Sequence, residues 1–232
     1  MPNTRAVAGT VDRRDQPAYR LTEAAHYVRL PRTTLASWVR GRDYGAGSGR
    51  AHFHPLIVPA DPRRPYLSFN NLVEAHVLRA LRAEHDVSVQ AVREARAFAE
   101  QEFGITRLLL DDGLLTGAGE LFLKRYGELV ELSRSGQIAM RRVLESHLSR
   151  IERAGNFPIR LHPFVQADVS DAKPIVIDPA VGFGRPIVAR TGIATAVIAE
   201  RVDAGESLDE VAADYGMQVD EVADAITYER AA

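Results

Sequence analysis

One stretch near the N-terminus, residues 20–41 (RLTEAAHYVRLPRTTLASWVRG), constrains the fold most. Apolar residues recur at helical spacing on both sides of a short break, which is typical of two helices joined by a tight turn. Thr22 is placed to cap the first helix. Pro31 has a fixed φ that suits the start of the second helix. The stretch therefore predicts a helix-turn-helix.

The outward face of the second helix carries arginines and hydroxyls, the side chains that read base edges and phosphates in the major groove. An ordinary helical hairpin with a polar face is the alternative interpretation. The predicted DNA contacts, from this motif and from the loop after it, are Thr22, Arg32, Thr33, Thr34, Ser37, Arg40, Arg42, Arg50, Arg63 and Arg64.

Charge is distributed unevenly along the 232 residues. Residues 1–65 hold 11 arginines against 5 acidic residues, whereas residues 165–232 hold 5 basic against 13 acidic residues. The net charges of +6 and −8 favour DNA binding at the first end only, since phosphates repel the acidic end. A solubilising role explains the acidic end equally well.

Composition narrows the possible functions. The chain has no cysteine, which excludes disulfides, thiolate nucleophiles and cysteine–metal sites. His52 and His54 form a pair without an evident third ligand, so we expect no metal site. We also expect no cofactor and no catalytic residues. No apolar run has the length of a membrane span, so we expect a cytoplasmic protein.

The first hundred residues divide into an arm, a winged motif and two helices. Residues 1–18 are expected to form a flexible arm. Strands at residues 56–58 and 66–69 are expected to form a wing, whose arginines hold backbone phosphates. Helices are expected over residues 70–85 and from Ser88 to Gly104.

Residues 19–104 resemble the winged-helix domain of MerR-type regulators. The resemblance rests on these elements together with the Thr34-Leu35 pair, Trp38 and Phe69. In that family the second helix enters the major groove and the wing contacts the backbone.

Residues 105–164 are predicted to form a β-rich linker or dimerisation segment. Leu108 to Leu110 is a short apolar run that ends at a turn signal. Residues 121–132 suggest a hairpin around Tyr126-Gly127. A helix is expected over residues 137–153, with a narrow apolar seam, and a strand over residues 159–161.

Residues 165–232 are predicted to form a small helical domain. Two short strands, residues 175–177 and 186–188, precede helices at residues 195–204 and 220–228. Ser207 and Glu210 form a capping-box pattern for a helix between these two. The segment resembles a small uncharacterised bacterial domain often encoded beside PIN-domain toxins.

The expected fold of the whole chain is α+β, mainly α. It has an N-terminal winged helix-turn-helix, a β-containing middle segment and a C-terminal three-helix unit similar to a helix-turn-helix.

Together the two resemblances cover most of the chain, which looks like the larger VapB-type antitoxins. The resemblance implies an autorepressor that binds operator DNA as a homodimer and neutralises a PIN-domain ribonuclease. Such toxins use acidic residues around a divalent metal, so an inserted arginine would pair with carboxylates. Arg185 and Arg190 are the candidates, unless they only hold their turns to nearby acidic helices. A MerR-like regulator with a small-molecule effector and a protein-binding scaffold remain alternatives.

Overall fold

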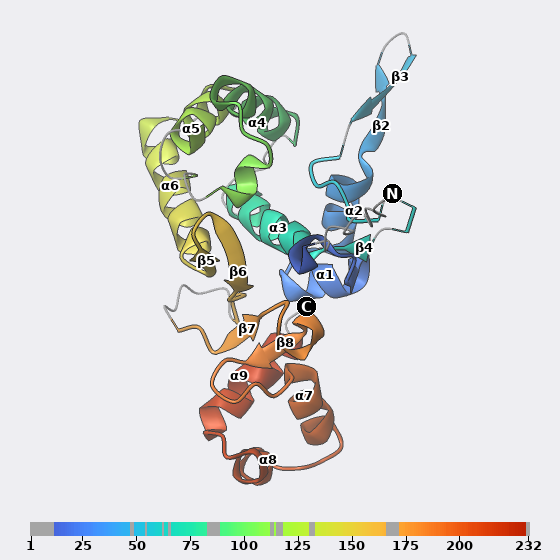
Figure 1. Ribbon diagram of the computed structural model, residues 1–232, viewed down its shortest axis with the longest axis vertical. Helices are drawn as coiled ribbons and strands as arrows, with labels where there is room; N and C mark the ends of the chain where they lie inside the picture. The colour runs from blue at the N-terminus through green and yellow to red at the C-terminus, as the bar shows by residue number, and fades with distance from the viewer. Residues whose placement is uncertain are drawn as a thin grey trace, which may run out of the picture.

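The computed structural model describes residues 12–46, 49–53, 55–61, 63–64, 66–82, 89–111, 114, 118–129, 133–165 and 172–230. This part of the chain forms a mainly helical α+β fold (Figure 1). An upper helical region continues through a small sheet into a C-terminal domain at the lower end of the view (Figure 1).

The predicted helix-turn-helix consists of α1 (Leu21–Tyr27) and α2 (Arg32–Arg40). A short antiparallel pair, β1 (Tyr19–Arg20) with β4 (Tyr66–Leu67), closes the motif. Leu35 and Trp38 on α2 are buried in a common core with residues of α1. The apolar spacing that predicts the two helices is therefore the spacing that fills this core.

The wing differs from its prediction. It is a hairpin of β2 (Arg42–Ala46) and β3 (Gly49–Phe53), which projects beyond the rest of the molecule (Figure 1). The predicted strand at residues 56–58 is wrong, because the amides of Leu56 and Ile57 donate to the Trp38 carbonyl and close the end of α2. The second predicted strand, residues 66–69, is partly right, but β4 pairs with β1 and its last residue, Phe69, begins α3.

The next elements are α3 (Phe69–Arg82), α4 (Val89–Phe103), α5 (Ala118–Leu129) and α6 (Arg134–Leu148). The predicted hairpin at residues 121–132 is wrong where the structure describes it, because α5 covers it to Leu129. Gly127 is a close-approach glycine rather than a turn residue: a Cβ there would lie 3.0 Å from the side chain of Gln137 on α6. The short apolar run Leu108–Leu110 is a 3-10 turn with two buried leucines.

The described end of the expected arm, residues 12–18, packs against the core instead of extending freely. Asp15 accepts hydrogen bonds from Asn70 Nδ2 (2.9 Å) and from Arg107 Nη1 (2.7 Å). Arg107 Nε in turn lies 2.9 Å from the buried Glu74 carboxylate. This network pairs the buried charge and holds the segment against α3. Residues 1–11 of the expected arm lie outside the described residues.

A four-stranded antiparallel sheet links the middle segment to the C-terminal domain. Its order is β5 (Ile151–Ala154), β6 (Phe157–Leu161), β7 (Ile175–Ile177) and β8 (Pro186–Val188). The helix predicted over residues 137–153 is too long, since α6 ends at Leu148 and Ile151 already belongs to β5. The strands predicted around residues 159–161, 175–177 and 186–188 are confirmed.

Three helices complete the C-terminal domain: α7 (Thr195–Asp203), α8 (Leu208–Tyr215) and α9 (Val219–Arg230). The predicted capping box is present, because the Glu210 amide donates to Ser207 Oγ and the Ser207 amide donates to Glu210 Oε2. Such a cap satisfies two amides that the first turn of a helix leaves unpaired.

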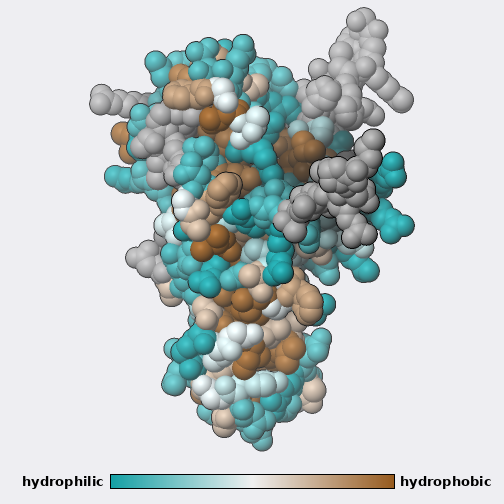
Figure 2. All heavy atoms as spheres, in the orientation of Figure 1, coloured by the Kyte–Doolittle hydropathy of each residue, from teal (hydrophilic) through white to brown (hydrophobic). Residues whose placement is uncertain are grey.

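Two hydrophobic cores result. The first joins the helix-turn-helix to α3–α6 and extends into β5, β6 and Ile177. The second lies among β7, β8 and α7–α9. On the face that Figure 2 shows, hydrophobic residues gather over the C-terminal domain between hydrophilic margins. None of the helices in the described part of the chain is long and apolar enough to cross a bilayer.

Candidate functional site

The turn between α1 and α2 is held by the C-terminal domain. Arg29 has a left-handed φ of 56°, which lets the chain reverse between the two helices. Its guanidinium donates to the carbonyls of Thr227 (3.3 Å) and Tyr228 (2.9 Å) in α9 and lies over the Tyr228 ring. The second helix of the motif is thus oriented partly by contacts from residues two hundred positions away.

The outer face of α2 presents a subset of the predicted contacts. Arg32, Thr33 and Arg40 are exposed. Thr34 is only 6% exposed, so its side chain does not belong to the outer face of α2, and its predicted DNA contact has no support from the fold. Ser37 is half-buried, and its hydroxyl donates to the Thr34 carbonyl at 2.7 Å, which occupies its proton within the helix.

Thr22 is exposed but does not cap α1. It lies inside the first turn, while the Glu23 carboxylate accepts a hydrogen bond of 2.7 Å from the Arg20 amide. Glu23 is the acidic residue at the positive, N-terminal end of α1, and it rather than Thr22 has the capping function. Thr22 remains a surface residue on α1, and its predicted DNA contact stays a prediction.

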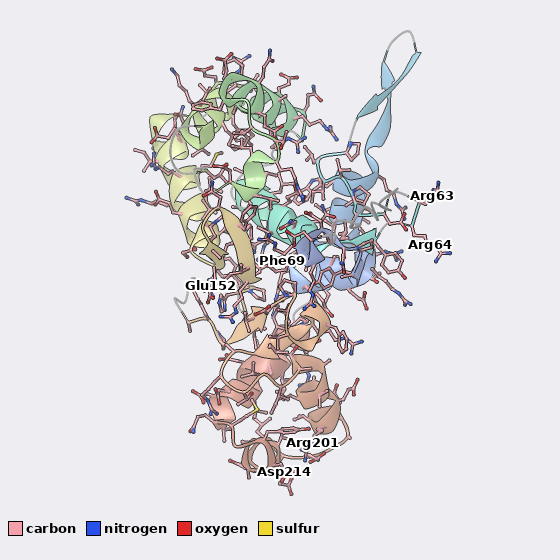
Figure 3. The ribbon with its side chains drawn as sticks, in the orientation of Figure 1. Arg63, Arg64, Phe69, Glu152, Arg201 and Asp214 are labelled. Atoms are coloured by element: carbon pink, nitrogen blue, oxygen red, sulfur yellow. The ribbon has the colours of Figure 1, made fainter. Side chains whose placement is uncertain are left out.

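The predicted wing arginines divide into two groups. Arg63 and Arg64 are exposed in the turn before β4, and their amides donate to Asp61 Oδ1 at 2.9 and 3.3 Å. Both side chains point outward, on the side of the molecule that carries α2 and the hairpin (Figure 3). Arg42 begins β2 and Arg50 lies opposite Gly45 in β3, but their side chains lie outside the described part of the structure.

Arginines of the C-terminal domain mostly form ion pairs within it. Arg190 forms a two-pronged pair with Glu221, at 2.8 Å from Nε and 2.6 Å from Nη2, and also donates to the Gly216 carbonyl. These hydrogen bonds raise the pKa of Arg190 and lower that of Glu221. Arg201 on α7 contacts Glu206 and Asp214, so it joins α7 to α8 (Figure 3). Of the two sequence candidates, Arg190 therefore has a structural role within the fold.

Arg185 differs from these. It is exposed, and among the described residues it has no carboxylate partner. Sequence reasoning missed the residue two positions before it, Phe183, which is 95% exposed. The available signal was an aromatic residue between two glycines in a loop, Gly182-Phe183-Gly184, because glycines on both sides permit an unusual backbone path.

A partly buried contact between α1 and α9 joins the two ends of the chain. His26 Nε2 lies 3.0 Å from Glu229 Oε2, and the Thr195 hydroxyl donates to the same carboxylate. Burial alone would raise the pKa of Glu229, but these hydrogen bonds lower it. The Tyr228 hydroxyl donates to the Tyr27 carbonyl at 3.0 Å. The C-terminal domain is thus docked on α1, the helix that precedes α2.

Two models of protein families match the two ends of the chain. A family model described as "Putative DNA-binding HTH domain" matches residues 17–96, and one described as "Protein of unknown function (DUF433)" matches residues 175–228. The protein "Putative antitoxin VapB45" of Mycobacterium tuberculosis is 32% identical over 230 residues, which cover 91% of this chain and 93% of that protein. The chain belongs to the VapB45 family. The predicted helix-turn-helix and C-terminal domain are therefore supported by the sequences of relatives as well as by the fold.

Two further relatives come from the same organism. "Uncharacterized protein Rv2308" is 27% identical over 222 residues, covering 92% of this chain and 90% of that protein. The solved structure "X-ray crystal structure of Rv2018 from Mycobacterium tuberculosis" superimposes with a TM-score of 0.66 at 26% identity. The match covers 90% of this chain and 97% of that one, so the fold of most of this chain recurs in a crystal structure.

Proposed function

We propose that this VapB45 relative is the antitoxin of a type II toxin–antitoxin pair, which represses its own operon and neutralises a PIN-domain ribonuclease. The observation that carries the proposal is a similarity that covers 91% of this chain and includes both terminal domains. The similar protein is named "Putative antitoxin VapB45". We assign DNA binding to residues 19–104, a linking and dimerisation role to residues 105–164, and toxin binding to residues 165–232.

The DNA interface consists of the outer face of α2 and the wing. Arg32, Thr33 and Arg40 are exposed on α2 and are available for base edges and phosphates. Arg63 and Arg64 lie on the side of the molecule that carries α2 and are available for the backbone (Figure 3). A homodimer would place two such helices about one turn of DNA apart and read a palindromic operator.

Toxin neutralisation belongs to the C-terminal domain in this proposal. The toxin class implied by the resemblance has an acidic site around a divalent metal, for which an arginine is the natural complement. Arg185 is available for such a contact, whereas Arg190 is occupied by Glu221. We therefore favour Arg185 over Arg190.

The test has two halves, both performed with the full chain. DNA binding is measured on the promoter region of the chain's own gene across a range of salt concentrations, where several phosphate contacts predict a steep fall in affinity. Toxin binding is measured with the PIN-domain ribonuclease encoded beside that gene. The expected result is a stable complex, loss of ribonuclease activity within it, and stronger growth arrest when the ribonuclease is expressed alone.

Each half has its own contradicting outcome. Equal affinity for the promoter and for unrelated DNA would refute autorepression. Undiminished ribonuclease activity in the presence of excess chain, or the absence of a PIN-domain gene beside it, would refute the assignment as an antitoxin of this toxin class.

A further inference from the structure

An aromatic side chain is displayed at the tip of the loop between β7 and β8. Phe183 is 95% exposed, the most exposed of the large hydrophobic residues in the described part of the chain. It lies in the left-handed region, with φ 57° and ψ 27°, and its neighbours Gly182 and Gly184 also have positive φ. A bulky residue in this region is strained, and such strain persists only where the surroundings fix it.

The surroundings do fix it. A Cβ at Gly184 would overlap the Tyr19 hydroxyl, so the loop lies directly against β1. Tyr19 is buried, and the amides of Gly184 and Arg185 donate back to the carbonyls of Val181 and Gly182. The phenyl ring is therefore held out by a rigid loop. A rigid aromatic side chain loses little conformational entropy when it is buried by a partner.

A cleft lies beside this ring, with one arginine in its lining and another two residues further along the loop. The cleft has a volume of about 540 Å³ and runs between residues 13–19 and residues 179–183. Arg13 lines it, and Arg185 lies close enough to Tyr27 that its charge opposes the burial-driven rise of the Tyr27 pKa. Within the described residues, neither arginine has a carboxylate partner.

Three acids near this surface, in contrast, are paired with arginines. Asp12 pairs with Arg14, Asp15 with Arg107, and Asp178 with Arg160 at 2.8 Å. The surface around Phe183 is thus locally cationic on a domain whose sequence is acidic overall. Exposed aromatic and arginine side chains are the residue types that dominate the energetics of protein interfaces.

We propose that Phe183, together with Arg13 in the same cleft and Arg185 two residues further along the loop, is the anchor through which this protein holds its toxin. The complementary surface is an apolar pocket rimmed by carboxylates, into which the phenyl ring inserts while the two guanidinium groups pair with the rim. This inference rests on the proposed function, since it takes the occupant to be the toxin rather than DNA or a second copy of the chain.

The experiment measures binding of the full chain to the ribonuclease used above, by calorimetry. Phe183→Ala is expected to weaken binding at least tenfold, and Phe183→Tyr to retain it. Arg185→Glu is expected to weaken binding by a similar factor, and Arg185→Lys by less. The matched controls are Phe103→Ala, at a half-exposed aromatic on α4, and Arg142→Glu, at an exposed cation on α6; both are expected to bind as the unsubstituted chain does.

Folding and DNA affinity are measured for every variant, and neither is expected to change for Phe183→Ala, because its side chain makes almost no contact within the molecule. Equal toxin binding by Phe183→Ala overturns the anchor while leaving the proposed function intact, whereas failure of the unsubstituted chain to bind refutes the proposed function itself. Weaker operator binding by Phe183→Ala would assign the ring to DNA, and a change from dimer to monomer would assign it to a second copy. Either result also overturns the anchor.

Discussion

The arginines of α2 and of the turn before β4 differ from most arginines of the C-terminal domain. On the N-terminal side, Arg32, Arg40 and the Arg63–Arg64 pair are exposed on elements that project towards one side. In the C-terminal domain, Arg190, Arg201 and Arg230 are bound to carboxylates of neighbouring helices.

This difference shows what a charge count can establish. The net charge is +6 for residues 1–65 and −8 for residues 165–232. These sums distinguish the two ends, but they do not show what each single arginine does. Cations that neutralise acidic helices stabilise the fold, whereas cations left exposed are available for a partner. Arg185 is the C-terminal arginine that behaves like the N-terminal set, and it lies next to the most exposed phenyl ring of the described residues.

The largest expected effect comes from removing the exposed cations of α2. Arg32→Ala and Arg40→Ala are each expected to cost about 1–3 kcal/mol of operator binding, so the double variant is expected to weaken Kd by about thirtyfold or more. If either side chain contacts a base, affinity for the operator falls more than affinity for random DNA. If both contact phosphates, affinity falls equally for all DNA. Electrophoretic or calorimetric titration with operator and random DNA distinguishes the two.

The control for these variants is Arg142→Ala, which removes an exposed arginine from α6 on the other side of the first core. Its affinity for the operator is expected to remain unchanged. If the double variant binds within threefold of the unsubstituted chain, the face of α2 is not the DNA interface, and the contrast between the two ends fails.

The next effect concerns the core that connects the two ends. His76 on α3 and His147 on α6 are buried with ring centroids 4.9 Å apart, against Phe164. Burial lowers the pKa of His147 to about 4 and that of His76 well below its usual 6.5, and the charges of Arg79 and Arg150 act in the same direction.

These shifts predict acid sensitivity with a definite sign. The unfolded chain binds protons on both histidines near pH 6.5, whereas the folded chain keeps His147 neutral down to about pH 4. Stability is thus fully present above pH 6.5 and falls by roughly 3 kcal/mol for His147 alone as pH drops towards 4. Urea unfolding between pH 4 and 7 measures the slope, which His147→Gln is expected to flatten. An identical slope in that variant would contradict the assignment.

The sequence predicted those parts of the fold whose signals are local. Apolar spacing located α1 and α2, and the Ser207–Glu210 pattern located the start of α8. Gly127 was misleading because a glycine in sequence looks the same whether it makes a turn or lets two helices approach. Its actual role depends on Gln137, which belongs to the next helix.

The candidate site shows the same limit. Thr34 and Thr33 are adjacent and chemically identical, yet one is buried and the other exposed, because helical rotation turns them to different faces. Phe183 has no helical or strand periodicity around it, and its display depends on the distant Tyr19. Features that arise from contacts between segments far apart in the chain could not be predicted from spacing alone.

A smaller effect is expected from the turn before β4. Replacing both Arg63 and Arg64 by alanine removes two exposed charges that we propose contact the DNA backbone, so binding should weaken similarly for all sequences. The slope of log K against log salt concentration is expected to become shallower by about one for each lost phosphate contact. Sequence preference should be unchanged. An altered preference would place these arginines in a groove rather than along the backbone.

The smallest expected effect is that of Arg190→Ala. Its guanidinium is half exposed and holds Glu221 and the Gly216 carbonyl, so its loss leaves a solvated carboxylate rather than a buried charge. Exposed ion pairs contribute little to stability, so differential scanning calorimetry should detect only a small fall in Tm. Toxin affinity should not change, in contrast to Arg185→Glu. A large loss of toxin affinity at unchanged Tm would mean that the toxin breaks the Arg190–Glu221 pair on binding. An arginine that is paired in the free protein would then also be available to a partner. The contrast between the two ends would hold only for the unbound state.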